Sequence, residues 1–503
     1  MARTALIVDL PSIGTIDRSA GQLARQLAAV LRDAVRKGEL KPGELLPSSR
    51  ALAQSLTLSR GTVTEAFDQL IAEGVLESQS RAGTRVSNAL SAQSGQNGLS
   101  LEDAAPVEMP LPPSAEAYAK VNAEFTALPH RPFAISVPVG LALPDDAWQR
   151  LGNRLRSRGD ARPSGYGEPQ GALVLREAIA DYLRRSRSVK CTAEQIIITS
   201  GAQQALFVCS QILLSPGDSV WVEDPAYRGL TAILENSARD PRIIRVPVDS
   251  EGMSIDAGIS LAAQARVAFV TPSHQYPLGM PMSMARRNAL LAWAKSQRAW
   301  VVEDDYDSEL RYAGHPFPSL QGLDPARVIY LGTFSKILFP SLRLGYAVVP
   351  KGLEAVFCGA RILMDRHPPS AEQHVLAAFM SEGHLDRHIR RIRSVYSERR
   401  NQLVDVLTDL IHPHLGWLQP SDQGMHVVLW LAEGLDDRAI AAAALAAGVS
   451  VRPVSSTYSS GKARPGLILG IGDYDFKLIE QAARQLAGLI DSFSKSPIEK
   501  RAL

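Results

Sequence analysis

The sequence predicts two domains: a small α+β domain at the N-terminus, and a large α/β domain with a mostly parallel sheet and a smaller C-terminal subdomain. Two observations indicate this division. The 503 residues are enough for two or more domains. Helical periodicity ending in a hairpin pattern fills the start of the chain, whereas short apolar runs alternate with helical segments in the rest. We place the first domain at residues 1–88, a linker at 89–130 and the large domain at 131–495.

Composition and charge narrow the location and the partners. The three cysteines, Cys191, Cys209 and Cys358, do not suggest a disulfide framework and favour a reducing compartment. No apolar run reaches membrane-spanning length, so we expect a cytoplasmic protein. The net charge is +2, and residues 1–90 carry all of it. Any preference for phosphate must therefore come from local placement near the N-terminus.

Three helices and a hairpin are predicted in the first domain. The first helix ends at Gly38, and a second, shorter one is capped by Ser48 or Ser49. After a three-residue turn, a third helix runs from Arg60 and stops at Gly74. Two short helices joined by such a turn form a helix-turn-helix. The strands V-L-E-S-Q and T-R-V-S, joined by S-R-A-G, then predict a β-hairpin wing.

Polar residues occupy the positions where a winged helix-turn-helix contacts DNA. The N-terminal residues of the second helix of the motif reach base edges in the major groove, and a glycine on the wing lets the backbone approach a phosphate. A protein-binding winged helix with incidental arginines is the alternative. The DNA-binding candidates are Arg50, Ser59, Arg60, Thr62, Arg81, Gly83 and Thr84.

The stretch G-x-L-x-P-G-x-x-L-P-S-S-R-x-L-A, followed by S-R-x-T-V, resembles the DNA-binding domain of the GntR family over roughly the first ninety residues. The resemblance implies double-stranded operator DNA as the partner and a homodimer on a paired operator. Between the domains, A-L-S-A-Q-S-G-Q-N-G and the acidic, Pro-containing sequence after it predict a flexible linker with few core-building groups. Such a tether lets the two domains dock in a variable relation, which a switch requires.

The large domain places polar groups where its predicted strands end. The strand Ile196 to Thr199 is followed by Ser200, Gly201, Ala202 and Gln203 at the start of a helix. Backbone N–H groups and the helix dipole make that position an anion site, suited to a cofactor phosphate. A strand-Gly-helix turn alone is weak evidence. Thr333, Ser335 and Arg343, which follow a later strand, would meet the same phosphate.

Two more clusters indicate the chemistry. The apolar run from Trp300 to Val302 ends in E-D-D-Y-D-S-E, and the run from Val328 to Leu331 ends in T-F-S-K. In an α/β sheet such strand ends face one crevice. Lys336 beside small hydroxyls has the setting of a Schiff-base nucleophile and is the catalytic candidate. Asp304 could hold a pyridinium nitrogen protonated, as pyridoxal 5'-phosphate requires. A lysine in solvent and an Asp pair that caps a helix would explain the same residues without a cofactor, and no metal site is indicated.

The motif S-K-x-x-x-P-x-x-R-x-G-Y after E-D-D-Y-D-S-E resembles the fold-type I aminotransferases, in the form found in the MocR subfamily of GntR-type transcription regulators. The resemblance implies three tyrosine roles. Tyr227 matches the aromatic residue that stacks on the pyridine ring, for which a core tyrosine is the alternative. Tyr306 matches the tyrosine that binds the ring's 3′ oxygen. Tyr166 in G-Y-G-E-P-Q-G matches the tyrosine that reaches the phosphate across the dimer, which implies a shared site.

Two departures from the aminotransferase pattern concern the ligand. The loop T-P-S-H-Q-Y-P-L-G has Tyr276 where N-P-x-G has asparagine, so Gln275 or His274 takes that role. Near the C-terminus, neither Arg464 nor Arg452 falls clearly on the position of the carboxylate-binding arginine. Transamination of amino acids is therefore in doubt, and the residue that binds the ligand's acidic group stays open.

An arginine row from Leu385 to Arg400 is interpreted as a solvated or ion-paired helix face, with a DNA-backbone surface as the alternative. The chain as a whole is predicted to be a DNA-binding transcription regulator. Its large domain is expected to bind pyridoxal phosphate and to sense an amine, an amino-acid-like effector or pyridoxal phosphate itself. An active aminotransferase with an appended DNA-binding domain is the competing hypothesis.

Overall fold

The computed structural model describes residues 16–79, 83–88, 110, 112–125, 129–138, 147–159, 165–314, 317–459, 463–472 and 474–495. The chain divides into two compact units, Met1–Pro110 and Leu111–Leu503. Each unit has its own hydrophobic core. None of the helices in the described ranges combines the length and the apolar character that crossing a membrane demands.

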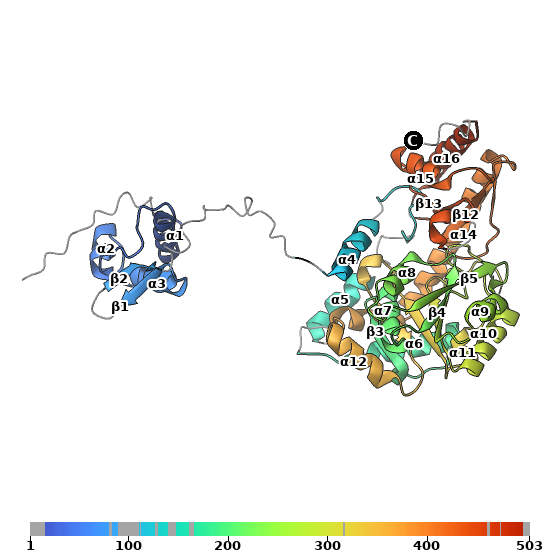
Figure 1. Cartoon of the computed structure of the whole chain (residues 1–503), viewed down its shortest axis with the longest axis horizontal. Helices are drawn as coiled ribbons and strands as arrows, with labels where there is room; N and C mark the ends of the chain where they lie inside the picture. Colours follow the sequence, from blue (N-terminus) through green and yellow to red (C-terminus); the bar gives the residue numbers. More distant parts are fainter. Residues whose placement is uncertain are drawn as a thin grey trace, which may run out of the picture. The chain divides into compact units, whose positions relative to one another are not determined.

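The N-terminal unit is a three-helix domain with a two-stranded wing, as predicted (Figure 1). The helices are α1 (Leu23–Arg36), α2 (Ser49–Leu56) and α3 (Arg60–Ala72), and the strands β1 (Leu76–Gln79) and β2 (Gly83–Val86) pair antiparallel. Leu27, Leu31, Leu52, Phe67 and Leu70 are buried together between the helices. Apolar residues at helical spacing thus close one small core.

Local hydrogen bonds fix where these helices begin. The Ser48 hydroxyl accepts the Ala51 N–H at 3.2 Å, which decides between the two predicted caps of α2. Ser59 caps α3 by accepting the Thr62 N–H at 3.0 Å. Such caps satisfy N–H groups that have no partner within the helix. They also set the position at which α3 presents its first turn.

One helix lies inside the predicted linker. Helix α4 (Pro113–Glu124) belongs to the second unit, and its residues are half-buried or exposed. The guanidinium of Arg228 donates to both carboxylate oxygens of Glu124, at 2.5 and 2.9 Å. Arg228 also pairs with Glu235 at 2.6 Å. This ion pair joins α4 to α8 (Arg228–Glu235), and the sequence reasoning missed the helix.

The large unit is built on an eight-stranded sheet of order β3-β10-β9-β8-β7-β4-β5-β6. Strands β5, β4, β7, β8 and β9 are parallel to one another, whereas β10 runs antiparallel to β3 and β9, and β6 antiparallel to β5. The strands are β3 (Ile196–Thr199), β4 (Ser219–Asp224), β5 (Arg242–Asp249), β6 (Gly252–Met253), β7 (Val267–Val270), β8 (Trp300–Asp305), β9 (Val328–Thr333) and β10 (Gly345–Val348). The mostly parallel sheet is as predicted.

Helices cover both faces of this sheet, because alternate strand residues point to opposite sides. Val220 and Val222 of β4 pack in a core with residues of α7 (Ala202–Leu213), α8 and α12 (Glu354–Met364). Trp221, between them, packs in the opposite core with α9 (Ile255–Ala262) and α10 (Met284–Gln297), where it stacks on Trp293 at 3.8 Å. Figure 1 shows α7 and α9 on either side of β4.

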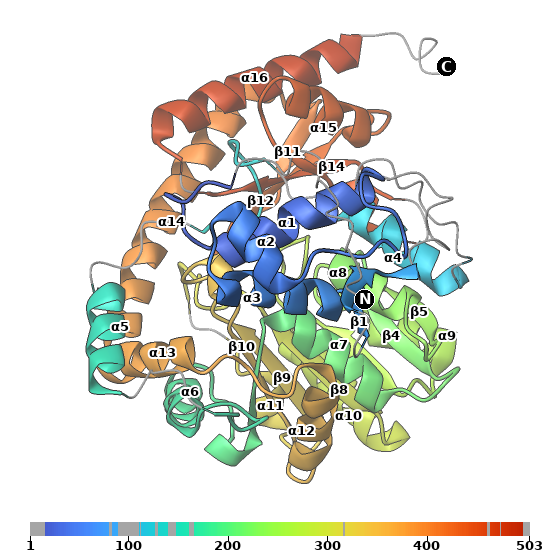
Figure 2. The same ribbon diagram turned by 90° about the vertical axis from the view of Figure 1, so that its left-hand side faces the viewer.

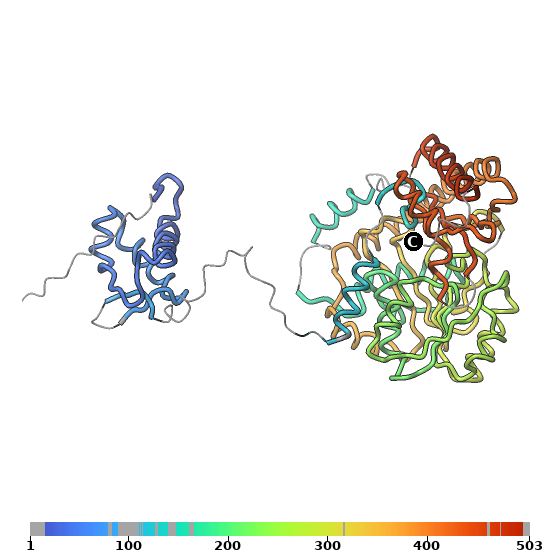
Figure 3. Tube along the Cα trace, turned by 45° about the horizontal axis from the view of Figure 1, so that its top comes forward, coloured from blue at the N-terminus to red at the C-terminus, as the bar shows by residue number. Residues whose placement is uncertain are grey.

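A smaller C-terminal subdomain completes the unit. Its sheet has the order β11-β12-β14-β13 and is antiparallel throughout. Its strands are β11 (Gly416–Leu418), β12 (His426–Leu431), β13 (Arg452–Pro453) and β14 (Gly466–Gly470). Helices α14 (His384–Leu410), α15 (Asp437–Ala446) and α16 (Phe476–Lys495) pack with it, in orange and red in Figure 2. The trace in Figure 3 shows this segment gathered at one end of the unit.

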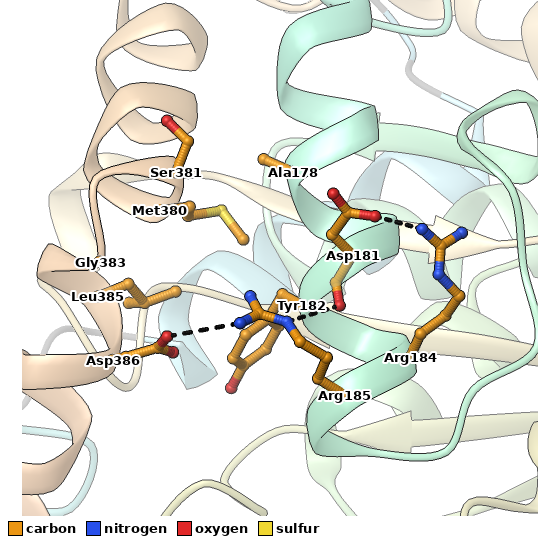
Figure 4. A pocket seen from close by; sticks show the side chains of 10 residues that line it. All are labelled: Ala178, Asp181, Tyr182, Arg184, Arg185, Met380, Ser381, Gly383, Leu385 and Asp386. Atoms are coloured by element: carbon orange, nitrogen blue, oxygen red, sulfur yellow. Dashed lines mark hydrogen bonds and ion pairs between the residues drawn. The ribbon is translucent and has the colours of Figure 1, made fainter.

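The remaining helices are α5 (Ala147–Arg158), α6 (Leu173–Ser186), α11 (Leu320–Leu323) and α13 (Ala371–Ser381). A surface cavity of about 540 Å³ lies between α6, α13 and the start of α14 (Figure 4). Arg184 and Arg185 enter it, but Asp181 and Asp386 pair with them. The cavity lining includes none of the residues predicted to form a site.

Candidate functional site

The candidate site lies where several strands of the large sheet end. Strands β4, β7, β8 and β9 are mutually parallel, so Asp224, Thr271, Asp305 and Thr333 follow or close them at the same edge. Strand β3 shares that direction, because β10 is antiparallel to both β3 and β9. Gly345 of β10 stands opposite Thr199 and opposite Thr333. The two predicted phosphate-binding segments are thereby brought together.

The turn from β3 to α7 and the loop after β9 form one anion-binding corner. Gly201 caps α7 with φ of +89°, a conformation that favours glycine. The Arg343 guanidinium donates to the Ser200 carbonyl at 2.6 Å, so it lies at the N-terminus of α7. The Ser335 hydroxyl is buried and has no hydrogen-bond partner in the structure. A helix N-terminus, a guanidinium and an unused hydroxyl together suit a phosphate.

Lys336 follows this corner in a half-buried position. Loss of hydration lowers the pKa of its amine from 10.5 to about 8, against the opposing effect of the Asp307 and Asp304 carboxylates. The cations Arg343 and Arg452 lower it further. A lysine in this setting is partly neutral near physiological pH, which is the state in which an amine acts as a nucleophile.

Three aspartates follow β8, and the structure gives each a different role. Asp305 is buried and pairs with buried Arg187 at 2.7 Å, so it is an internal ion pair. Asp307 contacts His274 at 2.8 Å. Asp304 keeps one oxygen, Oδ1, buried with no hydrogen-bond partner. Burial and the neighbouring Asp305 raise the pKa of Asp304 to about 7, while Lys336 acts to lower it. Asp305 Oδ1 and Asp307 Oδ1 are likewise buried without a hydrogen-bond partner in the described residues, but only Asp304 has neither an arginine nor a histidine paired with its other oxygen.

Tyr227 closes the crevice from the side of α8. Its hydroxyl donates to Gln203 Oε1 at 3.1 Å, and Gln203 Nε2 donates to the Gly229 carbonyl at 3.1 Å. A Cβ on Gly229 would lie 2.4 Å from the tyrosine ring, so only glycine fits there. Burial raises the pKa of Tyr227 to about 12, and Asp304 contributes to that rise. Gln203 and Tyr227, both predicted, therefore form one unit beside Asp304.

The loop after β7 brings Tyr276, His274 and Tyr306 into one aromatic cluster. The rings of Tyr276 and Tyr227 meet edge to face with centroids 5.9 Å apart, and those of Tyr276 and Tyr306 do so at 6.2 Å. The Tyr306 hydroxyl lies 3.0 Å from His274 Nδ1. Gln275 is buried and bonded within its own loop and to Pro225. Of the two residues left open by the sequence, His274 is therefore the one that contacts a predicted site residue.

Two arginines were left as candidates for an acidic ligand group, and they lie in different surroundings. Arg452 acts electrostatically on Lys336, Tyr227 and Tyr276, lowering the pKa of each. The Arg464 guanidinium instead stacks on Trp430, at 4.5 Å from the ring centroid. Arg452 is therefore the arginine that belongs to the crevice.

Within its own chain, Tyr166 does not join the other residues predicted to bind the cofactor. Its side chain is 79% exposed, and the Arg366 guanidinium stacks on its ring at 4.2 Å. Leu363, at the end of α12, is 90% exposed. Tyr166 and Leu363 are thus two large side chains that this chain by itself leaves exposed.

The candidate DNA interface is the first turn of α3 with α2 and the wing. Arg50 and Arg60 are exposed, and within the described part of the chain their guanidinium groups form no hydrogen bond or ion pair. The Thr62 hydroxyl lies 2.8 Å from that of Ser59, so the two share the cap. Gly83 and Thr84 begin β2, with Gly83 exposed. Arg81, the remaining predicted contact, lies outside the described residues.

Sequence reasoning did not assign several residues that the structure places at the crevice. Asp307 and Glu223 are buried acids there, and burial raises the pKa of Glu223 to about 7. Asp307 is part of the quoted E-D-D-Y-D-S-E run, and its position three residues after Asp304 was the available signal. Glu223 ends V-W-V-E at a strand terminus, the kind of position that was used for the other candidates.

A family model described as "Aminotransferase class I and II" matches residues 141–486, and one described as "Bacterial regulatory proteins, gntR family" matches residues 23–86. The chain is 36% identical over 483 residues, 94% of each protein, to the probable rhizopine catabolism regulatory protein MocR of Rhizobium meliloti. It is 33% identical over 470 residues to the HTH-type pyridoxine biosynthesis transcriptional regulator PdxR of Corynebacterium glutamicum, covering 93% of this chain and 96% of that one.

Among solved structures, the chain is similar to the kynurenine aminotransferase of Pyrococcus horikoshii in complex with PMP. The TM-score is 0.67 with 28% identity, over 79% of this chain and 98% of the other. The fold and the crevice thus define a class: a fold-type I aminotransferase domain joined to a winged helix-turn-helix. The chain belongs to the aminotransferase class I and II family and, with its N-terminal domain, to the MocR subfamily of GntR-type transcription regulators.

Proposed function

We propose that the protein is a DNA-binding transcription regulator whose large domain binds pyridoxal phosphate and senses an amine, an amino-acid-like effector or the cofactor itself. One observation carries the proposal: a single chain presents exposed, unpaired Arg50 and Arg60 on a helix-turn-helix and a crevice with a lysine of lowered pKa facing Asp304. The relatives named above as regulators support it.

The unused polar atoms of the crevice fit pyridoxal phosphate. Asp304 Oδ1 lacks a partner and suits a protonated ring nitrogen, and the Ser335 hydroxyl lacks a partner and suits a phosphate oxygen. A cationic group beside Asp304 would also remove the cost of its buried charge. Arg343, Thr333 and the N-terminus of α7, from Gly201 to Gln203, would hold the phosphate with Ser335. Tyr227 would lie against the ring and Tyr306 would donate to its 3′ oxygen.

The bound cofactor supplies an electron sink for a ligand amine. The residues of the chain prepare that chemistry. Lys336, with its pKa near 8, presents an amine that is neutral in roughly a tenth of molecules at pH 7. Asp304, in its ionised form, would keep the ring nitrogen of the bound cofactor protonated. Arg452 places a positive charge in the same crevice, which suits an acidic group on the effector.

We further propose that the protein acts as a homodimer with a shared site. Tyr166 and Leu363 are among the most exposed apolar side chains in the described residues. In a dimer, Tyr166 would serve the phosphate of the partner subunit, which accounts for its separation from the other candidates in its own chain. A regulator of chromosomal DNA acts in the cytoplasm, and we propose that location.

The competing function is an active aminotransferase with an appended DNA-binding domain, which the lowered pKa of Lys336 beside Asp304 supports. Absorbance of the cofactor, followed with amine donors alone and then with an added keto acid, separates the two. A regulator gives one spectral change without continuing keto-acid production, and an enzyme gives steady turnover. Sequencing the DNA fragments that the purified protein retains identifies the operator, and failure to retain any specific fragment contradicts the regulator.

A further inference from the structure

A buried imidazole, which the sequence offered as one of two replacements for the asparagine of aminotransferases, lies beside the crevice. His274 lies in the loop after β7, and its side chain and that of Asp307 are each 1% exposed. The side-chain amide of its neighbour Gln275 is already hydrogen-bonded. It donates to the carbonyls of Pro225 and Tyr276 at 2.8 Å and accepts a hydrogen bond from the Leu278 N–H at 3.1 Å. Gln275 therefore shapes the loop, whereas His274 reaches out of it.

Two groups meet the same nitrogen of His274. Asp307 Oδ2 lies 2.8 Å from Nδ1, and the Tyr306 hydroxyl oxygen lies 3.0 Å from Nδ1. An ionised carboxylate can only accept a hydrogen bond, so the contact with Asp307 requires a hydrogen on Nδ1. Nδ1 then has no lone pair to accept the hydrogen of Tyr306. The hydroxyl hydrogen of Tyr306 must point to another acceptor.

Two carboxylates that act on Tyr306, Asp307 and Asp304, each have a buried Oδ1 without a hydrogen-bond partner in the described residues. Burial and the negative charge of Asp307 raise the pKa of Tyr306 well above its usual value, so it keeps its hydrogen at neutral pH. Besides Asp307 and Asp304, the titratable groups that act on Tyr306 include Tyr276 and Glu223. Tyr306 therefore keeps a hydrogen that His274 Nδ1 does not accept and that is available to a ligand in the crevice.

The backbone holds the imidazole in this position. A Cβ on Gly424 would lie 1.9 Å from the ring carbon Cε1 of His274, and one on Gly279 would lie 3.2 Å from Nε2. Both glycines have positive φ, +88° and +85°. His426 packs on the other side with ring centroids 5.1 Å apart, its own Nε2 bonded to the Pro277 carbonyl. The packing around His274 thus fixes the position of its imidazole ring.

We propose that His274 and Asp307 are positioning residues that aim the hydroxyl hydrogen of Tyr306 at the 3′ oxygen of pyridoxal phosphate. The inference rests on the proposed function. It differs from a direct contact between His274 and the cofactor, and from a structural role confined to the loop. Asp307 accepts the hydrogen bond from Nδ1 and so keeps the hydrogen on that nitrogen. Nδ1 then cannot accept a hydrogen bond from Tyr306, and the Tyr306 hydroxyl donates to the cofactor instead.

A double-mutant cycle on Asp307 and Tyr306 tests this order of action. The dissociation constant for pyridoxal phosphate is measured by titration of the cofactor-free full chain. Asp307→Asn releases the hydrogen on Nδ1, so Tyr306 can donate to His274 instead, and affinity should fall about ten-fold, the scale of one hydrogen bond to a charged group. The affinity of Tyr306→Phe for pyridoxal phosphate should fall by a similar factor. The double variant should bind the cofactor no more weakly than Tyr306→Phe.

The cycle also separates a second route. Asp307 supports the charged form of Lys336 directly, and that effect does not pass through Tyr306. If Asp307→Asn weakens cofactor binding equally with and without the Tyr306 hydroxyl, the charge route operates and the positioning proposal is wrong. Wild-type affinity in Asp307→Asn also overturns it. Failure of the wild-type protein to bind the cofactor would instead refute the proposed function.

Variants of His274 complete the experiment. Asparagine places an amide N–H near the position of Nδ1, so His274→Asn should retain most of the affinity, whereas His274→Leu should lose about as much as Tyr306→Phe. His426→Gln, a buried neighbour that does not touch Tyr306, is the matched control and should bind as wild type. Thermal unfolding of each cofactor-free variant shows that it folds. Equal losses in His274→Asn, His274→Leu and His426→Gln would mean a packing role and would overturn the proposal.

Discussion

At the scale of single residues, the crevice is governed by the burial of charge. Lys336 and Asp304 each lose hydration, and each shifts toward its neutral form while attracting the other. Arg187 neutralises Asp305 directly, and His274 engages Asp307. Each of the three keeps one buried oxygen, Oδ1, without a hydrogen-bond partner in the described residues. Three aspartates within four residues of sequence therefore lie in three different surroundings.

We expect Lys336→Ala to lose covalent attachment of the cofactor and to retain its fold. Borohydride treatment in the presence of pyridoxal phosphate should attach the cofactor to Lys336 in the wild-type chain, and mass spectrometry locates it. Lys351→Ala, which removes an exposed lysine, is the control and should react as wild type. Attachment at an unchanged level in Lys336→Ala would contradict the assignment.

The raised pKa of Asp304 predicts a pH-dependent stability of the cofactor-free protein. The native state binds a proton at Asp304 up to about pH 7, whereas the unfolded chain releases it near 3.8. The free energy of unfolding therefore falls as the pH rises between these values. Asp304→Asn removes this contribution, so the variant should lose less stability than wild type between pH 5 and pH 8, as measured by thermal unfolding.

Asp305→Asn is the matched control for that comparison. Asp305 neutralises a buried arginine, so its loss leaves Arg187 unpaired and should destabilise the protein by about 3–5 kcal/mol at both pH values. Burial also raises the pKa of Glu223 and of Glu303 to about 7, so the wild-type slope has several sources. The difference between the pH slopes of wild type and Asp304→Asn isolates the contribution of Asp304. An identical slope in the two proteins would contradict the assignment.

At the scale of elements, strand β10 joins the two halves of the anion-binding corner. Gly345 pairs with both β3 and β9, and the Gly201 backbone approaches it closely. Arg343, two residues earlier, has φ of +50° and reaches the Ser200 carbonyl. The position of the anion-binding corner thus depends on the absence of a side chain at Gly345 in β10.

Gly345→Ala should destabilise the large domain and weaken phosphate binding. A Cβ there would lie 2.8 Å from Gly201 Cα and 2.9 Å from the Gly332 carbonyl oxygen, and backbone atoms cannot move aside cheaply. Overpacking of this kind costs about 1–3 kcal/mol. Gly488→Ala, in α16 with nothing near its Cβ, should instead stabilise by about 0.5–1 kcal/mol. Denaturant unfolding measures both, and equal effects in the two variants would exclude the proposed crowding.

At the scale of the whole molecule, the protein joins two units whose functions we expect to separate by mutation. The winged helix has its own core, and the crevice residues belong entirely to the second unit. In the proposed homodimer, an effector would influence the operator by changing how the two DNA-binding domains are spaced or oriented. The linker contains helix α4, which Glu124 and Arg228 attach to the large domain.

Arg60→Ala should abolish specific DNA binding and leave the cofactor spectrum intact. A lost base contact costs about 1–3 kcal/mol on the preferred site, and a lost phosphate contact reduces the salt slope by about one. Arg25→Ala on α1, which removes an exposed charge elsewhere, should bind DNA as wild type.

Lys336→Ala should bind the operator and lose its response to effector. If the segment Met1–Asn88 binds as tightly as the full chain and effector leaves the footprint unaltered, the coupling is refuted.

Leu363→Glu should weaken the proposed homodimer. The side chain is 90% exposed in the single chain, so the substitution leaves the fold of the protomer unchanged, whereas a carboxylate buried between two chains is costly. Sedimentation velocity over a range of concentrations measures the change. Leu261→Glu, at a half-exposed leucine of α9, is the control. An unchanged dimer in Leu363→Glu would place the interface elsewhere.

The sequence by itself determined the local structure and the kind of chemistry. Helix periodicity and the apolar runs before polar clusters depend on neighbours within a few residues, so both fold classes were predictable. The cap of α2 was left between Ser48 and Ser49, and the roles of Lys336 and Asp304 stay predictions. The resemblance of two motifs then indicated the subfamily. Helix α4 was missed because its residues resemble a linker and one distant ion pair attaches it.

Only the tertiary structure decided which residues meet. Asp305 meets Arg187 and Asp307 meets His274, across 118 and 33 residues of sequence, whereas the assignment of Asp304 to the cofactor stays a prediction. The choice of Arg452 over Arg464 depends on the packing of a separate sheet. Pairings of this kind follow from strand order and register, which no short stretch of sequence contains. Periodicity fixes the face on which a side chain lies, and the arrangement of the sheets fixes its partner.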